Sequence, residues 1–347
     1  MEDKIVSPDV IATHIAHWNT PFVERAIFGT ADAAFIAQQV SHFCIHEFGS
    51  AIAEYLFYES SQGAVSGLKL DDGRHVVIKI HQPGQSEDFL RAVHAVQNHL
   101  HRHGYPCPRP ILGPRPLANG LAVVEELVDD GIYLDAHDPA IRQRMAEAFA
   151  WLVELSLDVR HQPGLPTGLL SNLPPGDLWP KPHSAIFDFQ ATSSGAEWID
   201  RLASEAQRIM LSCPGENVLG HTDWSVKHFR FIAGKTHVIY DWDSLRLDKE
   251  PLLVGDAARG FPMTWNLPEP IRITPTQDEL HAFVAEYEEA RGKIFTNAER
   301  IALAASVTGA IAYGARCEHS LHPHETDFPT GSCRDILAHY GSTFFIS

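Results

Sequence analysis

Two short segments near the middle of the chain decide how the sequence is interpreted: GHTDWSVKHFRF, residues Gly220–Phe231, and VIYDWDSL, residues Val238–Leu245. Each contains an aspartate-bearing loop next to an apolar run of strand length. The pattern predicts a loop, a strand, a turn at Gly234–Lys235, a second strand and a second loop. Because the ends of a hairpin meet, we expect Asp223 and Asp241 to lie close together.

Two converging loop carboxylates are suited to phosphoryl transfer. One carboxylate can orient or deprotonate an attacking hydroxyl group, while the other holds a Mg²⁺ ion that bridges the phosphates of ATP. The simpler alternative is that both aspartates only form turns, where this residue type is common. The pair, downstream of a lysine in a predicted strand, favours the functional interpretation.

That lysine is Lys79, in the segment HVVIKIH, residues His75–His81. Strand alternation places it on one face with Val77 and His81, while three apolar residues occupy the opposite face. An ammonium group within an apolar strand is unfavourable unless it meets an anion. Lys79 is therefore a candidate phosphate ligand; the alternative is an edge strand whose lysine faces water.

Apolar periodicity divides the chain into a strand-rich part and a later helical part, which predicts an α+β fold. Up to about residue 42 we expect helices, one of them capped by Thr30. Helices dominate again from about residue 138. Between these parts the predicted elements are strands at 52–59, 64–70, 75–81 and 121–127, a hairpin turn at Asp72–Gly73, a helix at 86–104 and a proline-rich connection at 105–117.

The composition bounds the class of protein. A chain of 347 residues makes one large domain or two lobes. Its formal net charge of -17 argues against nucleic-acid binding and mildly favours cationic ligands. We expect no membrane association, because no run of 18 apolar residues occurs and the start, MEDKIVSPDV, does not resemble a secretory signal. Five widely spaced cysteines are typical of free thiols in the cytoplasm, and nothing indicates an oligomeric state.

Over roughly residues 44 to 315, the chain resembles the aminoglycoside phosphotransferases and the related choline and small-molecule kinases, which share the protein-kinase-like fold. HTDWSVKH resembles the family's H-x-D-x-x-x-x-N catalytic loop. VIYDWDSL resembles its metal loop, an apolar residue followed by Asp, Phe or Trp, and Asp or Glu. Weaker likenesses are VVIKIH for a phosphate lysine, HGYPCPRPIL for a Gly-x-Pro-x-Pro segment, VVEEL for the strand before the interlobe hinge, and VGDAARGF, whose Asp256 would brace the catalytic loop.

The resemblance implies a bilobal protein with a small antiparallel-sheet N-lobe and a larger, mainly helical C-lobe. Residues 1–126 would form N-terminal helices and the nucleotide-binding N-lobe, and residues 127–347 the C-lobe with the catalytic loop and acceptor site. The implied reaction moves the γ-phosphate of ATP to a hydroxyl group of a small molecule, aminoglycoside-like or an amino alcohol. The implied site residues of the C-lobe are Asp223 for catalysis and, for the metal ion, Asp241, His228 and Asp243.

The resemblance also assigns residues to the nucleotide. ATP would lie between the lobes, with Lys79 on its phosphates and backbone groups near Glu126 and Leu127 on its adenine. The remaining implied contacts come from the loop YESSQGAVSG and from the helix at 86–104: Ser60, Ser61, Gly63 and His94.

Three departures from the family pattern keep a second class of protein open. His228 stands where the family has a metal-binding asparagine, and imidazole suits Mg²⁺ poorly. Either one metal site is weakened, or Asp243 or water substitutes, or the preference shifts toward Mn²⁺. His94 stands where a helix glutamate is expected, and the phosphate loop contains few glycines. The chain could therefore bind a nucleotide or a partner without transferring phosphate, although the retention of Lys79, Asp223 and Asp241 favours an enzyme.

Three other features have two interpretations each. The segment 163–190 carries motif-like fragments, but they are too close together to frame a hairpin, so it is either a surface connection or a cover of the acceptor site. His99 and His103 have the i, i+4 spacing of metal ligands, yet a solvated helix face is favoured. Acidic residues at 278–289 either attract a cationic acceptor or face water. The identity of the acceptor, and ATP against GTP, stay open.

Overall fold

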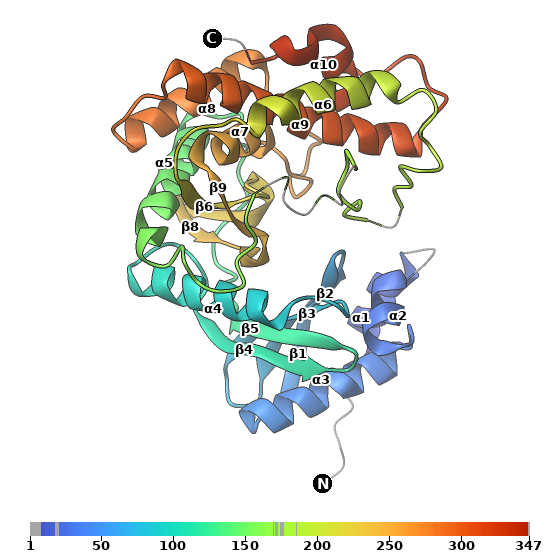
Figure 1. Ribbon diagram of the computed structural model, residues 1–347. Helices are drawn as coiled ribbons and strands as arrows, with labels where there is room; N and C mark the ends of the chain where they lie inside the picture. The colour runs from blue at the N-terminus through green and yellow to red at the C-terminus, as the bar shows by residue number, and fades with distance from the viewer. Residues whose placement is uncertain are drawn as a thin grey trace. The chain divides into compact units, whose positions relative to one another are not determined.

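The computed structural model describes residues 8–17, 21–168, 170, 173, 177–184 and 186–345. The chain forms two compact units (Figure 1). The N-terminal unit comprises residues 1–101, 108–129 and 162–164, and the C-terminal unit comprises 102–107, 130–161 and 165–347. Among the described residues, no helix combines the length and the apolar character that a membrane crossing requires.

The N-terminal unit is built around an antiparallel sheet with the strand order β1-β2-β3-β5-β4. The four predicted strands are all present, and Gly73, with φ of 88°, makes the predicted turn between β2 and β3. The elements are α1 (Asp9–Ala16), α2 (Phe22–Phe28), α3 (Ala33–Phe48), β1 (Ile52–Ser60), β2 (Gly63–Leu70), β3 (His75–His81), α4 (Glu87–Arg102), β4 (Pro110–Leu117) and β5 (Gly120–Glu126).

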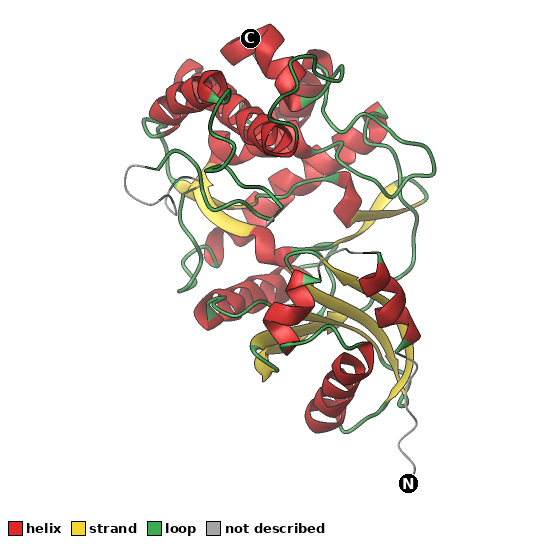
Figure 2. Ribbon diagram, turned by 90° about the vertical axis from the view of Figure 1, so that its right-hand side faces the viewer, coloured by secondary structure: helices red, strands yellow, loops and turns green. Residues whose placement is uncertain are grey.

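One face of this sheet is the core of the N-terminal unit. Val76, Ile78 and Ile80 are fully buried there and pack with apolar residues of α2 and α3. Figures 1 and 2 show α3 alongside the sheet. Lys79 is half-buried on the other face, as the alternation of β3 predicted. The apolar face fixes the register of β3, and the register in turn fixes the side from which the ammonium group projects.

Two local predictions in this unit were wrong. The predicted connection at 105–117 contains β4, a strand that pairs only with β5 at the edge of the sheet. Its prolines are tolerated because an edge strand leaves half of its backbone N–H groups without a ladder partner. The N-cap of α3 is Asp32, whose side chain accepts a hydrogen bond from the Phe35 N–H (2.8 Å), and Thr30 accepts from Asp32 one step earlier.

The C-terminal unit is mainly helical, with two small antiparallel sheets, β6-β9 and β7-β8. The long helix α9 packs against α6, α7 and α10. The elements are α5 (Pro139–Leu155), α6 (Glu197–Met210), β6 (Asn217–His221), β7 (Phe229–Ile232), β8 (Lys235–Ile239), β9 (Leu245–Lys249), α7 (Glu250–Gly260), α8 (Gln277–Ala290), α9 (Asn297–Leu321) and α10 (Cys333–Tyr340), with 3-10 turns η1 (Ser156–Asp158), η2 (Val226–His228), η3 (Trp242–Ser244) and η4 (Gly341–Thr343).

The predicted hairpin is present as β7 and β8, but its turn lies one residue earlier than expected. Ile232 pairs with Lys235, and the two residues between them, Ala233 and Gly234, have positive φ values of 49° and 71°. Two-residue turns of this kind match the right-handed twist of the strands, so the hairpin adopts one even though alanine is a poor residue for the left-handed conformation.

Gly63 tests how closely β2 and β3 approach each other. A Cβ atom added at Gly63 would lie 2.5 Å from the carbonyl oxygen of Ile80, which belongs to a strand with neighbours on both sides. We expect Gly63→Ala to lower the free energy of unfolding by about 1–3 kcal/mol, measured in urea. The control Gly113→Ala meets only His94, at 3.9 Å, and should change it by about 0.5 kcal/mol. Equal losses would contradict the close approach.

Candidate active site

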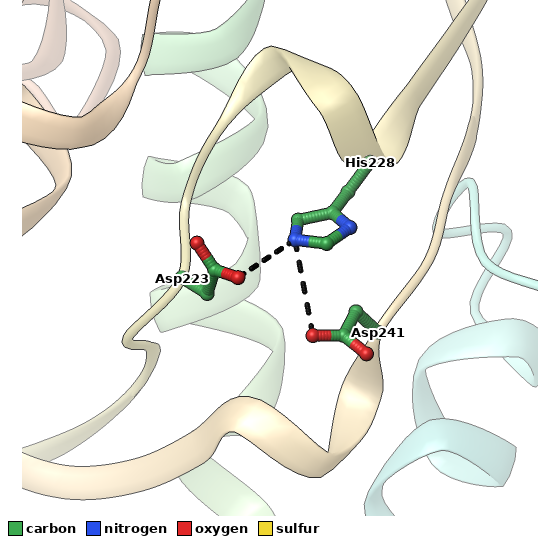
Figure 3. A group of neighbouring side chains, drawn as sticks. All are labelled: Asp223, His228 and Asp241. Carbon is green, nitrogen blue, oxygen red and sulfur yellow. Dashed lines mark hydrogen bonds and ion pairs between the residues drawn. The ribbon is translucent and has the colours of Figure 1, made fainter. Parts of the chain in front are cut away.

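The two loops of the hairpin bring three potential metal ligands together. Ligand atoms of Asp223, His228 and Asp241 all lie within 4.8 Å of one another. Asp223 follows β6, His228 ends the 3-10 turn before β7, and Asp241 follows β8. Figure 3 shows one imidazole nitrogen facing both carboxylates. That atom, Nε2, lies 3.0 Å from Asp223 Oδ2 and 3.8 Å from Asp241 Oδ2.

Backbone hydrogen bonds tie the two loops to each other. The N–H and hydroxyl groups of Thr222 both donate to the carbonyl oxygen of Ser244, at 2.9 and 3.0 Å. The Tyr240 N–H donates to the carbonyl oxygen of His228 at 3.0 Å. These bonds fix the separation of the two loops, and with it the distance between the backbone positions of Asp223 and Asp241.

His221 supports the catalytic loop from beneath. Its Nδ1 accepts the Asp223 N–H (3.2 Å), so its Nε2 carries the proton and donates to the Tyr240 carbonyl oxygen (3.3 Å). The rings of Trp224 and Trp242 pack edge-on against it. Burial, followed by the positive charge of His228, lowers the pKa of His221 to about 4. A neutral imidazole therefore joins the backbone of both loops.

Lys227 is a site residue that the sequence analysis missed. Its Nζ lies 2.8 Å from Asp223 Oδ2, the same oxygen that His228 contacts. The i, i+4 spacing was visible in the sequence, but loop residues at that spacing meet only when the backbone between them turns back, and here Ser225 is extended and η2 begins at Val226.

The two cations hold Asp223 in its ionised form. Burial would raise the pKa of its carboxyl group, but the hydrogen bond and charge of His228 and the charge of Lys227 outweigh burial and hold that pKa well below its usual range. A carboxylate with so low a proton affinity is a weak base at neutral pH. It can still accept a hydrogen bond from a hydroxyl group and align it.

Asp241 is held in a left-handed conformation with φ of 69°, which is uncommon for a residue other than glycine. The Ser244 hydroxyl donates to its Oδ2 (3.2 Å). Asp243, predicted as a further ligand, lies in the following turn η3 and is not one of the three clustered residues. Two carboxylate oxygens and one imidazole nitrogen are donors that a divalent cation can use.

The residues predicted for the nucleotide phosphates all lie in the N-terminal unit. Lys79 projects from the face of β3 opposite the apolar core, where its strand partner is Val123. The hydroxyl and N–H groups of Ser60 are both within hydrogen-bond distance of His14 Nε2, at 2.9 and 3.1 Å. The Ser61 N–H donates to the Gly63 carbonyl oxygen (3.1 Å) within the β1–β2 turn. The loop is thus a tight hairpin tip.

The structure limits how the predicted adenine-binding residues and His94 could contact a nucleotide. The N–H groups of Glu126 and Leu127 already donate to the carbonyl oxygens of Arg109 and His75, so adenine would meet their carbonyl groups. His94 lies near Gly113 of β4, a strand separated from β3 by β5. The pKa of His94 is lowered by burial and then by the charge of Arg115.

The residue of α4 that hydrogen-bonds to the sheet beside β3 is Gln97, three positions after His94. Gln97 is buried, and its amide donates to Glu125 Oε2 (2.7 Å) and to the Pro108 carbonyl oxygen (3.0 Å). Glu125 of β5 shares the sheet face of Lys79, because Val123 pairs with Lys79 and alternate residues of a strand share a face. Glu125 therefore lies on the strand next to Lys79, two positions along from Val123, the β5 partner of Lys79.

The segment 163–190 lies partly outside the described residues, at 169, 171–172, 174–176 and 185. Its described part includes His183, whose Nδ1 lies 2.8 Å from the Tyr313 hydroxyl group. Burial lowers the pKa of His183, while the charge of Asp223 opposes and that of Lys227 adds to this shift. His183 therefore lies within electrostatic range of the catalytic loop. The rings of Phe187 and Tyr313 pack against His183, and those of Trp179 and Phe189 pack against Tyr313.

Asp256 of α7 was predicted to brace the catalytic loop. No hydrogen bond joins the two within the described part of the chain, and their interaction is electrostatic. Burial raises the pKa of Asp256 to about 7, Arg259 opposes this, and the charge of Asp223 adds to it.

The fold and the clustered carboxylates define the class as a phosphotransferase with a kinase-like fold, and the comparison with known families agrees. The profile of the phosphotransferase enzyme family matches residues 65–293, which is more than half of the chain. The chain belongs to this family. A comparison with curated protein sequences gives no match.

Solved structures of the same fold are similar over most of the chain. An amicoumacin kinase in complex with AMP-PNP, Ca²⁺ and Ami has a TM-score of 0.58 at 12% identity, covering 87% of this chain and 91% of that one. Spectinomycin phosphotransferase with ADP and spectinomycin gives 0.53 at 14%, covering 84% and 89%. An aminoglycoside phosphotransferase from Alicyclobacillus acidocaldarius gives 0.51 at 12%, covering 83% and 89%. At such identities, the likeness establishes the fold alone.

The buried neutral His221 predicts a loss of stability in acid. Its pKa is 6.5 in the unfolded chain and about 4 in the folded one, so below pH 6.5 only the unfolded chain binds the proton. From pH 7 to pH 5, this group should lower the free energy of unfolding by about 2 kcal/mol. In urea unfolding, His221→Gln is less stable than the parent at pH 7, and that difference should shrink by this amount at pH 5. A difference independent of pH would contradict the assignment.

Proposed function

We propose that this protein is an ATP-dependent kinase that transfers the γ-phosphate to a hydroxyl group of a small molecule. The observation that supports it most directly is the cluster of Asp223, His228 and Asp241, which two bonded loops hold within 4.8 Å. Membership of the phosphotransferase family supports the reaction class. Lys79 supports the nucleotide, because its strand presents it on the face of the sheet opposite the apolar core.

In the proposed mechanism, Asp223 accepts a hydrogen bond from the acceptor hydroxyl group and aligns its oxygen for in-line attack on the γ-phosphorus. The low pKa of Asp223 makes early removal of the proton unfavourable. The proton therefore moves to the carboxylate late, when the O–P bond has largely formed and the hydroxyl group has become acidic. Positioning and charge neutralisation, rather than base strength, supply most of the acceleration.

The charge on the phosphates is neutralised from two sources in this proposal. Lys79 pairs with phosphate oxygens of ATP, and backbone carbonyls at Glu126 and Leu127 accept hydrogen bonds from adenine. Asp241, with His228 beside it, would hold a divalent cation, Mg²⁺ or Mn²⁺, whose charge stabilises the phosphate oxygens when bound. Ser244, by donating to Asp241, keeps that carboxylate turned toward the cluster.

The acceptor is proposed to be a small polyol or amino alcohol with an apolar or planar part. His183 lies within electrostatic range of Asp223, and with the aromatic rings around Tyr313 it would offer such a part a wall to pack against. The negative charge of the chain is compatible with a cationic acceptor. Structures of the same fold were solved with spectinomycin and with Ami, which makes antibiotics suitable first probes.

Asp223→Asn tests the catalytic role. The amide keeps the shape but loses the charge that aligns the hydroxyl group, so we expect acceptor-dependent ADP release to fall about 10²–10⁴-fold. Affinity for Mg²⁺ and AMP-PNP, measured by calorimetry, should stay near the parental value. Transfer at the parental rate would refute the assigned role.

The same assay separates the second class of protein. The parent is incubated with ATP and Mg²⁺ or Mn²⁺, and with a panel of amino sugars, amino alcohols, spectinomycin and amicoumacin. A thermal shift with nucleotide but no transfer to any acceptor would favour a kinase homologue that binds without catalysis.

His228→Asn tests the cation preference. Replacing the imidazole nitrogen by an amide oxygen should strengthen AMP-PNP binding with Mg²⁺ relative to Mn²⁺, because Mg²⁺ prefers oxygen ligands. The comparison variant Asp241→Asn should weaken binding with both cations. Calorimetric titrations with each cation provide the ratio, and an unchanged ratio in His228→Asn would show that His228 is not a ligand.

A further inference from the structure

Lys227 carries a charge that the proposed mechanism has not yet used. Its ammonium group is 2.8 Å from Asp223 Oδ2 and lies over the ring of Trp265, 5.4 Å from its centroid. The side chain is only 18% exposed. A lysine placed for solubility alone would extend into water, whereas this one stays on the carboxylate that aligns the acceptor.

The backbone holds this lysine in place as firmly as its side chain does. The Lys227 N–H donates to the Met263 carbonyl oxygen (3.2 Å), and the Asn266 amide donates to the Lys227 carbonyl oxygen (3.4 Å). The segment that makes these two contacts also carries Trp265, which is 66% exposed. The ammonium group is therefore set between a fixed carboxylate and an aromatic face, with the ring attracting the cation.

An ammonium group has three N–H donors, and Asp223 uses one of them. In the described residues, the two contacts of this group are the carboxylate and the Trp265 ring. A hydroxyl group aligned by Asp223 lies about 3 Å from the phosphorus it attacks. Oxygens of the moving phosphoryl group therefore pass within a few ångströms of the same carboxylate, and of Lys227 beside it.

We propose that Lys227 is a second catalytic cation, whose ammonium group donates to an oxygen of the phosphoryl group during transfer. This inference rests on the proposed kinase function. The acceptor oxygen forms a bond to the γ-phosphorus, the bond from that phosphorus to the bridging oxygen of ADP breaks, and the acceptor proton passes to Asp223. Lys227 keeps all three protons and contributes charge only.

The need for such a cation follows from His228. The imidazole that replaces an oxygen ligand weakens Mg²⁺ binding on one side of the cluster. A protein-borne positive charge, fixed before the reaction, can stabilise the same phosphate oxygens without reorganisation. The rival role for Lys227 is structural, as a partner that only neutralises Asp223.

Aluminium fluoride with Mg²⁺ and ADP separates the two roles without any knowledge of the acceptor, because it imitates the moving phosphoryl group. We expect Lys227→Met to bind Mg²⁺ and ADP like the parent but to lose about tenfold or more of the extra affinity that aluminium fluoride adds. Lys227→Arg should keep most of it. Calorimetry measures each affinity, and urea unfolding checks that each variant is folded.

Lys235→Met is the matched control, because Lys235 lies exposed on the same hairpin at the start of β8. It should retain the full gain from aluminium fluoride. With spectinomycin or amicoumacin as acceptor, Lys227→Met should lower kcat on the order of 10²-fold and leave the KM for ATP unchanged.

If aluminium fluoride raises the ADP affinity of Lys227→Met as much as that of the parent, the role of Lys227 is overturned while the kinase function stays intact. If Lys227→Met does not fold, Lys227→Arg decides the matter, since loss of its gain despite a retained charge at the site contradicts the proposal. A parent that binds Mg²⁺ and ADP but gains nothing from aluminium fluoride would refute the kinase function, and this inference with it.

Discussion

The repulsion between the carboxylates of Asp223 and Asp241 is the constraint on which the rest of the site depends. Two unit charges about 5 Å apart repel by about 3 kcal/mol at an effective dielectric constant of 20. The hydrogen bonds between Thr222 and Ser244 and between His228 and Tyr240 hold the two loops together, so the carboxylates stay close in spite of this repulsion. A cation must offset it, and the protein supplies the ammonium group of Lys227, on the same oxygen of Asp223 that His228 contacts.

This arrangement explains why the loops rest on apolar and neutral residues. Trp224 and Trp242 are almost fully buried, and His221 between them is kept neutral by burial. A charged histidine there would add a positive charge below the loop. It would make the electrostatic potential at the carboxylates less negative and so less attractive to a metal ion. The buried side chains of Trp224, Trp242 and His221 therefore provide rigidity, while the charged groups of the proposed site lie in the half-buried layer above them.

Much of the fold was predictable because it rests on periodicity. Strands β1, β2, β3 and β5 alternate or are bounded by turn residues, and the β7–β8 hairpin is framed by its aspartates. The strand β4 was missed because its prolines suggest a connection, and only its position at the sheet edge makes them acceptable. The turn at Ala233–Gly234 lies one residue earlier than predicted, because the strand twist outweighs the low preference of alanine for the left-handed conformation.

The predicted site was incomplete where contacts depend on irregular backbone or on helical phase. Lys227 meets Asp223 through an irregular loop, in which an extended Ser225 is followed by a 3-10 turn, and no periodicity indicates such a loop. His94 was predicted to contact the nucleotide from the α4 segment, and the residue of α4 that hydrogen-bonds to the sheet is Gln97.

The location of the glutamate on a strand of the sheet, rather than on α4, has a physical consequence for Lys79. A glutamate on α4 would change its distance to the strand whenever the helix shifts, whereas Glu125 on β5 is fixed by the ladder that also fixes Lys79. Gln97, a neutral amide, holds Glu125 without competing for its charge. The position of Lys79 on the sheet is thereby coupled to the register of the sheet, and the register is coupled to the apolar face of β3 that the core buries.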